Sequence, residues 1–386
     1  MDKFRYFLKN IDYTYLAIIV AFALVSLISL YHVNELQNEN FVPKQTAFYI
    51  IGFIMFFLIT YAVDIDILKR VSLYIYILCF ILLFGILVAP SSISTEINKA
   101  LGWYSVGGFS FQPAELMKVG LIIQLASIIS RSNENTQSVS NEFILILKLI
   151  LTTALPTLVV MRFPDYGNAM VFLAILAIML IVSNIRVKVL AAIFALPLLI
   201  IGTLALTYFI APDFFLDKIL GLLPGYQASR FYGWLDPETY TISGYQLNQS
   251  IMSIGAGGLI GYEKLPSIPY AYSDLIFAII GGVYGFVGTS IVIFLYFLMI
   301  YKIISISQRY HDDFGTYIGV GIAGFLTFQV FQNAGMSVGL MPVTGIGLPL
   351  ISYGGSALVI TLMALGLVMC IKANTLTLSF SSQSNR

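Results

Sequence analysis

Ten apolar segments of membrane-spanning length recur along this chain, and they restrict its fold more than any other feature. A helix needs about 20 mostly apolar residues to cross the hydrocarbon core of a bilayer. We therefore predict an all-α polytopic membrane protein with about ten transmembrane helices. The predicted helices cover residues 13–32, 46–63, 68–90, 114–130, 143–161, 169–184, 187–210, 273–301, 314–341 and 350–373.

The composition excludes a soluble alternative. Of the 386 residues, 59% are hydrophobic and 10% are charged, whereas a soluble domain carries about 25% charged residues. The net charge is +1 and no basic patch lies outside the loops, so nucleic acid is not an expected partner. Cys79 and Cys370 both fall inside apolar segments, which favours neither a disulfide nor a metal site.

The chain divides into one long membrane domain and a short tail. Residues 1–373 are predicted to form a single transmembrane domain. Residues 211–272 form a long extracellular loop between the seventh and eighth helices. Residues 374–386 are rich in Ser and Thr, and we predict a disordered cytoplasmic tail there.

The orientation follows from the distribution of Lys and Arg. With the N-terminus inside, the inner segments hold 13 of these residues and the outer segments hold seven. Cytoplasmic loops carry an excess of Lys and Arg, so both termini are predicted to be cytoplasmic. The 211–272 loop then lies on the outer side.

Asp274 is the only charged residue between Lys264 and Lys302, and it begins the eighth apolar segment. A carboxylate at mid-depth in a membrane costs about 2.5–3.5 kcal/mol on insertion scales, and such residues are usually functional. The orientation places Asp274 at the outer surface. It is therefore the first candidate for a catalytic residue.

Two further charged positions lie on the outer side. Glu115 and Lys118 follow Pro113, which suits the first turn of a helix, and their spacing lets them share one helix face. They form either an interfacial ion pair or part of a site, and the sequence leaves both readings open. Asp165 lies in a short outer turn, for which a structural role is favoured.

The remaining polar groups of the outer side lie in two uncharged stretches. Gln246, Gln249 and Ser250 would share one face if their segment is helical. Glycines at 255–261 permit close backbone approach but lack the strand–turn–helix context of a nucleotide fold. The segment 333–356 is uncharged and irregular, so it must pack into the bundle beside a cavity, where its hydroxyls and free amides could face a polar ligand.

Four sequence motifs together resemble the SEDS family (shape, elongation, division and sporulation), the group of RodA and FtsW. They are QPAELMK at 112–118, GYQLNQS at 244–250, SD at 273–274 and the long segment 333–356. The resemblance covers nearly the whole chain and includes the ten-helix plan. It implies a peptidoglycan glycosyltransferase of the bacterial cytoplasmic membrane. Such an enzyme polymerises lipid II, an undecaprenyl-pyrophosphate-linked disaccharide-pentapeptide, beside a class B penicillin-binding protein that crosslinks the strands.

The resemblance also implies roles for individual residues. Asp274 matches the essential aspartate of the family and would act as the general base on the acceptor sugar. Arg230 and Lys118 would hold the pyrophosphate, and Glu115 would either orient Lys118 or act as a second carboxylate. The remaining predicted substrate-binding residues are Gln246, Gln249, Ser250 and Ser352.

The sequence departs from the family pattern around the proposed base. Residues 269–274 read PYAYSD, where many members carry Pro-Glu-x-His-Thr-Asp, and Gly281 and Gly282 replace a common acidic pair. Gly102 stands where an arginine is usual. Asp274 keeps its place but loses polar neighbours, and a divalent cation is not supported by the sequence.

Two other functions remain as alternatives. A flippase or transporter of lipid-linked cell-wall precursors would also contain intramembrane charges and broken helices. A non-catalytic scaffold of a cell-wall complex would tolerate the lost neighbours of Asp274. Within the family, the short termini and residues 343–345 favour the rod-shape branch.

Overall fold

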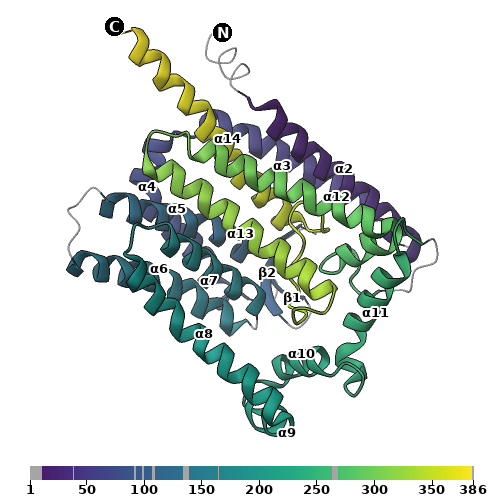
Figure 1. The fold of residues 1–386 in the computed structure, drawn as a ribbon. Coiled ribbons are helices and arrows are strands. Elements are labelled where there is room, and N and C mark those ends of the chain that lie inside the picture. Colours follow the sequence, from purple (N-terminus) through teal and green to yellow (C-terminus); the bar gives the residue numbers. More distant parts are fainter. Residues whose placement is uncertain are drawn as a thin grey trace.

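The structure, a computed structural model, describes residues 11–37, 39–90, 93–97, 100–106, 109–133, 139–163, 165–262 and 268–384. The helices run along one another in a single bundle, and the beginning of α2 lies at the same end as α14's final turns (Figure 1). Lys3, Arg5, Lys9, Lys99 and Lys264, which contribute to the predicted orientation, lie outside the described residues.

Each of the ten predicted apolar segments corresponds to a helix, although parts of those segments, among them residues 273–275, 338–341 and 350–354, lie outside the helices. They form α2 (Tyr13–Gln37), α3 (Val42–Ala62), α4 (Ile65–Gly85), α5 (Pro113–Asn133), α6 (Val139–Arg162), α7 (Tyr166–Ile181), α8 (Val187–Ile210), α12 (Ile276–Ser307), α13 (Asp313–Ser337) and α14 (Gly355–Ser384). Within the described ranges, nine helices are long and apolar enough to span a membrane, and α7 is a shorter apolar helix of 16 residues.

Helix α14 runs to Ser384, beyond residue 373 where the sequence predicts a disordered tail. A helix that is already nucleated adds one hydrogen bond per residue, so it can continue into a segment of modest propensity. The single-domain boundary at residue 373 stays a prediction.

The least apolar spans lie deepest in the bundle. In α5, 83% of the most apolar stretch is buried inside the protein, and in α13 the share is 72%, whereas in α8 none is buried. Polar side chains at membrane depth must face protein or a water-filled cavity rather than lipid. This explains why the fourth and ninth segments, which carry charged and amide residues, are still membrane helices.

The connection between α8 and α12 is largely helical, whereas the sequence predicts a loop. It contains α9 (Pro212–Phe214), the π-helical turn η1 (Phe215–Ile219), the 3₁₀ turn η2 (Leu220–Leu222), α10 (Gly225–Leu235) and α11 (Thr241–Gly257). In Figure 1 these elements extend from the far end of α8 and return along the bundle to α12. The helical form of α11 confirms the helix assumed for Gln246, Gln249 and Ser250.

A small antiparallel sheet precedes α5, and no strand is predicted there from the sequence. It consists of β1 (Ser94–Ile97), β2 (Ala100–Val106) and β3 (Phe109–Phe111) in the order β1-β2-β3. The Tyr104 hydroxyl donates a hydrogen bond of 2.9 Å to the Leu82 carbonyl oxygen, which ties the sheet to the end of α4.

Helix α12 is broken at Gly285, whose φ is +61°. The freed backbone groups pair with the glycine-rich end of α11: the amide of Phe286 donates to the Gly258 oxygen at 2.9 Å. The Tyr262 amide in turn donates to the Gly282 oxygen at 2.8 Å. The expected close backbone approach of the 255–261 glycines is confirmed. It gives hydrogen-bond partners to the backbone groups freed at the kink, which lipid could not supply.

The irregular segment between α13 and α14 packs into the bundle, as expected. Its backbone carbonyls accept hydrogen bonds from side chains of α2, α3, α12 and α13, so they are satisfied without water. The donor and acceptor pairs are Ser26 and Ile351, Tyr49 and Leu350, Tyr296 and Pro349, Gln45 and Ser352, and Asn333 and Ile346.

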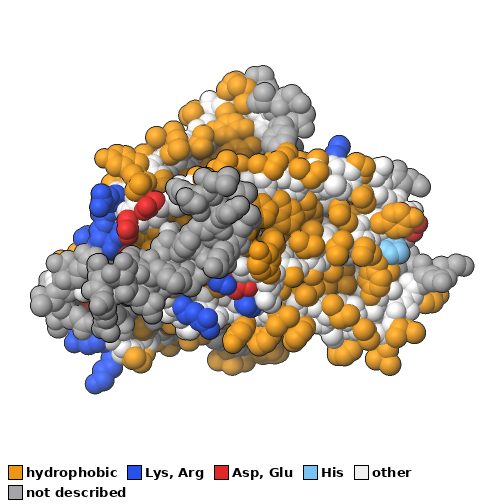
Figure 2. All heavy atoms as spheres, turned by 90° about the horizontal axis from the view of Figure 1, so that it is seen from above, with side chains coloured by type: hydrophobic (Ala, Val, Ile, Leu, Met, Phe, Trp, Pro, Cys, Tyr) orange, Lys and Arg blue, Asp and Glu red, His pale blue; other side chains and the backbone are white. Residues whose placement is uncertain are grey.

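The opposite end of the bundle carries its own charge cluster. Asp12 accepts from Lys372 at 2.5 Å and from Lys302 at 3.4 Å, which joins the beginning of α2 to α12 and α14. From above, hydrophobic side chains dominate the visible surface, and most visible Lys and Arg side chains gather towards this end (Figure 2). The cytoplasmic position of the termini stays a prediction.

Candidate active site

Asp274 lies in the turn immediately before α12, on the opposite end of that helix from Lys302. Its side chain is partly exposed. The Ser273 hydroxyl donates to Asp274 Oδ1 at 3.1 Å, and the Asn333 amide donates to the Asp274 backbone oxygen at 2.7 Å. The turn that carries the carboxylate is therefore held in place by hydrogen bonds from Ser273 and Asn333.

Ser352 supports the same turn from the segment after α13. Its hydroxyl donates to the Ser273 oxygen at 2.5 Å and accepts from the Leu348 amide at 2.6 Å. The Tyr353 amide donates to the Tyr272 oxygen at 2.8 Å. The Ser352 hydroxyl is thus already engaged with the backbone on both sides, and these contacts give it a positioning role.

Arg230 of α10 faces the same space as Asp274. Gly345 lies between them with φ of +79°, and a Cβ built there would be 3.8 Å from Arg230 Nη2 and 3.9 Å from Asp274 Oδ2. The left-handed backbone requires glycine at this position. The ends of both side chains therefore lie within van der Waals distance of the position that a Cβ of residue 345 would take.

The electrostatic surroundings of Asp274 act in opposite directions. Burial raises the pKa of Asp274 above its ordinary value, while its own backbone amide, the Ser273 hydroxyl and the positive charge of Arg230 lower it. The net effect is a raised pKa. A raised pKa suits a carboxylate that must take up a proton during a reaction.

Glu115 and Lys118 form an ion pair on the first turns of α5. Lys118 Nζ lies 2.7 Å from Glu115 Oε1, with side-chain exposures of 2% for the lysine and 11% for the glutamate. The interfacial alternative, in which the lysine reaches out to the membrane surface, is therefore wrong. The pair is enclosed by protein, where a charge requires a partner.

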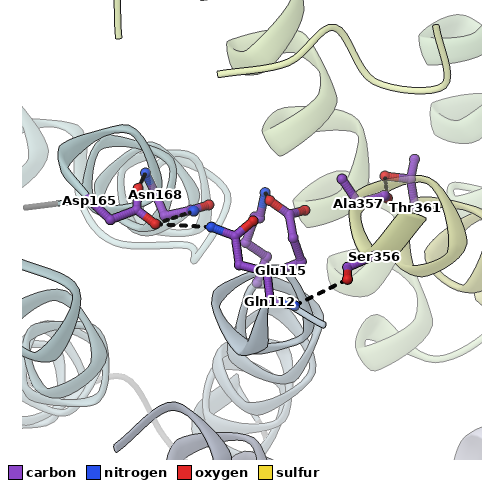
Figure 3. Close-up of polar contacts among 8 residues, drawn as sticks. Gln112, Glu115, Asp165, Asn168, Ser356, Ala357 and Thr361 are labelled. Carbon is purple, nitrogen blue, oxygen red and sulfur yellow. Dashed lines mark hydrogen bonds and ion pairs between the residues drawn. The ribbon is translucent and has the colours of Figure 1, made fainter. Parts of the chain in front are cut away.

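A second polar cluster surrounds the beginning of α5 (Figure 3). Asp165 caps α7 and accepts from the Gln112 side chain at 3.1 Å and the Asn168 side chain at 2.8 Å. The backbone amide of Gln112 donates to the Ser356 hydroxyl at 3.1 Å. Asp165 thus has the structural role favoured from the sequence, and it also fixes the helix that carries Glu115.

The beginning of α7, next to Asp165, and the Asp274 turn both contact the backbone segment after α13. Gly167, at the beginning of α7, approaches the Thr344 oxygen so closely that a Cβ would lie 3.3 Å from it. The next residue, Gly345, faces Arg230 and Asp274. The segment after α13 therefore links the polar cluster around Asp165 to the Asp274 turn.

The predicted residues of α11 take different positions. Ser250 is fully buried, and its hydroxyl donates to the Ser337 oxygen at 2.7 Å, which fastens α11 to α13. Gln246 and Gln249 are partly exposed, and Gln249 Oε1 has no hydrogen-bond partner among the described residues. Ser250 is thus engaged in packing, whereas the substrate-binding assignment of the two glutamines stays a prediction.

Sequence reasoning missed Asn333 and Gln112 as site residues. Asn333 appears in the sequence only as a polar residue within an apolar span, and that signal could have identified it. Within the described part of the chain, no group of three or more His, Cys, Asp or Glu side chains could hold a metal ion. Cys79 and Cys370 are buried free thiols.

Comparison with known families gives one match across nearly the whole chain. The family model described as "Cell cycle protein", which covers FtsW, RodA and SpoVE, matches residues 9–377. The chain belongs to the FtsW/RodA/SpoVE family. This result confirms the resemblance to the SEDS family, while the preference for the rod-shape branch remains a leaning.

Individual members of the FtsW/RodA/SpoVE family are similar over most of their length. Stage V sporulation protein E of Bacillus subtilis is 32% identical over 85% of this chain and 86% of its own. A probable peptidoglycan glycosyltransferase FtsW of Saccharophagus degradans is 33% identical over 84% of this chain and 81% of its own.

Two solved structures share the fold of this FtsW/RodA/SpoVE member. A chain from a peptidoglycan synthase complex that coordinates polymerization and crosslinking covers 95% of this chain and 98% of its own, with 24% identity and a TM-score of 0.76. The rod shape determining protein RodA of Thermus thermophilus covers 94% and 96%, with 24% identity and a TM-score of 0.66. At this identity the two structures support the helical architecture alone.

Proposed function

We propose that this protein is a peptidoglycan glycosyltransferase that polymerises lipid II at the outer face of the bacterial cytoplasmic membrane. Relatives named as probable peptidoglycan glycosyltransferases support this reaction. The observation that carries the proposal is the meeting of Asp274 and Arg230 at Gly345. A base and a cation close to one another are what transfer of a sugar from a pyrophosphate carrier needs.

In the proposed reaction, Asp274 removes the proton from the 4-hydroxyl of the acceptor GlcNAc. The resulting oxygen attacks the donor sugar carbon that bears the lipid pyrophosphate. The new glycosidic bond forms as the bond from that carbon to the pyrophosphate oxygen breaks, and the pyrophosphate leaves with the electron pair. The proton stays on the Asp274 carboxyl until solvent removes it.

The two cations of the site lie in different places: Arg230 is near Asp274, and Lys118 pairs with Glu115 on α5. Arg230 lies near Asp274 at Gly345 and can offset the charge that develops on the leaving pyrophosphate. Lys118 is neutralised in part by Glu115, so a bound phosphate would compete with that carboxylate for the ammonium group. In the proposal, Glu115 holds Lys118 in place until the anionic substrate enters.

The transporter alternative needs a polar path that continues to the other end of the bundle. At that end, Asp12 pairs with Lys372 at 2.5 Å and with Lys302 at 3.4 Å, which joins the beginning of α2 to α14 and α12. This arrangement supports a one-sided site. A class B penicillin-binding protein would accept the finished strands as the partner transpeptidase.

The decisive experiment uses fluorescent lipid II and the purified protein, with and without the transpeptidase. The Asp274→Asn variant keeps the shape of the side chain but cannot act as a base, so we expect glycan synthesis to fall by at least about 100-fold. Asp213→Asn, at an exposed carboxylate of α9, is the matched control. Polymerisation at the wild-type rate by the Asp274→Asn variant would overturn the proposal.

A further inference from the structure

We propose that Gln45, a fully buried amide of α3, is a positioning residue for Asp274 that acts through Ser352. Gln45 holds the backbone of Ser352. Ser352 in turn holds the backbone of Ser273, whose hydroxyl donates to the Asp274 carboxylate. The reaction assigned to Asp274 rests on the proposed function, whereas the placing of its turn rests on these contacts alone.

Gln45 is the only amide side chain in the sequence of α3. A buried amide within a membrane bundle is costly unless its N–H and C=O groups are paired. Its Nε2 donates to the Ser352 carbonyl oxygen at 3.2 Å and to Ser26 Oγ at 3.1 Å. Its Oε1 accepts from the Gly354 amide at 3.4 Å. The side chain therefore holds the backbone on both sides of Tyr353.

The backbone that Gln45 holds follows a strained residue. Leu350 has a φ of +65°, a conformation that costs free energy for a branched side chain and persists only where the surroundings fix it. Tyr49, one turn after Gln45 on α3, donates to the Leu350 carbonyl oxygen. Ser26 of α2 donates to the Ile351 oxygen at 2.7 Å. The strained turn is thus held by α2 and α3 rather than by its own local preference.

Ser352 transmits this restraint to the turn that carries the proposed base. Its hydroxyl donates to the Ser273 oxygen at 2.5 Å, immediately before Asp274 in the chain. Without the amide from α3, the Ser352 oxygen loses a donor and the turn can relax towards an unstrained φ. A displacement of about 1 Å at a reacting group can lower a rate by about 100-fold, so a small relaxation is enough to be measured.

The test compares Gln45→Met with Thr60→Val in lipid II polymerisation. Methionine has nearly the volume of glutamine but no amide, so the packing of α3 is kept. Thr60 lies about 22 Å further along α3. It is also buried, and it donates to the Gly366 oxygen of α14 at 3.2 Å. Its valine variant is therefore the matched control, since it removes a hydrogen bond between α3 and α14 far from Asp274.

We expect Gln45→Met to lower kcat by at least about tenfold, because the proposed base is displaced. KM should stay within about twofold, since a fully buried side chain does not touch the substrate. Thr60→Val should leave both constants within about twofold of the wild type. Ser26→Ala removes a smaller part of the same restraint and is measured where Gln45→Met does not fold; it should lower kcat in the same direction.

The pH–rate profile separates positioning from a loss of folded protein. Burial raises the pKa of Asp274, and the Ser273 hydroxyl is one of the groups that oppose this rise. A loosened turn weakens that hydrogen bond, so the fall of kcat/KM at low pH should move to higher pH in Gln45→Met. A smaller folded fraction would lower the rate without moving the profile, and that result would overturn the inference.

A double-mutant cycle with Ser352→Ala tests the route. If the restraint passes through the Ser352 hydroxyl, Gln45→Met should lower the rate of the Ser352→Ala variant by no more than about threefold. Effects of the two substitutions that simply multiply would contradict the route and overturn the inference.

Hydrogen exchange tests the inference without an enzymatic readout. The amides of Ser273 and Tyr353 donate to the oxygens of Tyr270 and Tyr272, and we expect both to exchange at least about tenfold faster in Gln45→Met than in Thr60→Val. Equal exchange in the two variants would overturn the inference, even in an active polymerase. Faster exchange in Gln45→Met, in a protein that makes no glycan, would refute only the proposed function.

Discussion

Asn333 is the position at which a single substitution should test how the active-site turn is held. Its side-chain amide is fully buried on α13 and donates to the Asp274 oxygen at 2.7 Å and to the Ile346 oxygen at 2.8 Å. It thereby joins the turn that carries the base to the segment that contains Gly345.

The expected cost of Asn333→Leu follows from these two hydrogen bonds. Each buried carbonyl that loses its donor costs about 1–3 kcal/mol, so the substitution should cost about 2–6 kcal/mol. Asn333 Oδ1 has no partner in the described part of the chain, so its removal breaks no further bond. Leucine has a similar volume, and a cavity term should therefore be small.

The assay compares lipid II polymerisation and thermal unfolding of Asn333→Leu with those of Gln329→Leu. Gln329 lies one turn earlier on α13 and is also buried, at 6% exposure, but it is not hydrogen-bonded to the Asp274 turn. We expect Asn333→Leu to lower kcat by at least tenfold, while Gln329→Leu changes it much less. Equal effects of the two substitutions, or a wild-type kcat in Asn333→Leu, would refute the reasoning.

Three further predictions address the charges and the backbone. Asp274 must be ionised to act as a base, so kcat/KM should fall at low pH with an apparent pKa above the usual aspartate range. Arg230→Gln removes a charge that lowers this pKa, so the fall should move to higher pH. A pH–rate profile that does not move in Arg230→Gln would contradict this. Lys118→Ala should raise KM for lipid II by about tenfold, and unchanged kinetics would restrict the lysine to a structural role. Gly261→Ala should destabilise by at least about 1–3 kcal/mol, because φ is +105° and the new Cβ would lie 1.8 Å from a backbone oxygen. Gly202→Ala, with nothing within 4 Å, should leave the melting temperature equal or higher.

The membrane helices could be predicted from the sequence because a bilayer leaves the backbone few choices. Backbone groups in lipid must be satisfied within a helix, so a long apolar run is a strong signal. The small sheet β1-β2-β3 lies outside the apolar segments, where this constraint does not act. The break at Gly285 also escaped prediction, because its partners at Gly258 and Leu259 come from a different part of the chain.

The site could be predicted as far as its charged residues. Asp274 and Arg230 were both identified from the sequence, and the fold brings them to the same space. Ser352 was expected to face a ligand, but its hydroxyl is bound to backbone on both sides. A motif shows which residue type is present, whereas the choice between ligand and backbone partner depends on tertiary packing.

The departures from the family pattern are coupled in space. Gly281 replaces one residue of the usual acidic pair, and its carbonyl oxygen would lie 2.0 Å from a Cβ at Gly257. The backbones of α11 and α12 can therefore approach this closely only because residue 257 is glycine, while a Cβ at Gly281 would lie 2.9 Å from the Ile254 side chain of α11.

This close contact changes what supports the proposed base. Without the acidic pair, the beginning of α12 is fixed by backbone pairing with α11, and the Asp274 turn is fixed by Ser273, Asn333 and Ser352. The lost polar side chains are thus replaced by backbone contacts and neutral donors. Such contacts keep the carboxylate in position without adding negative charge. Burial therefore raises the pKa of Asp274, and the positive charge of Arg230 opposes that rise.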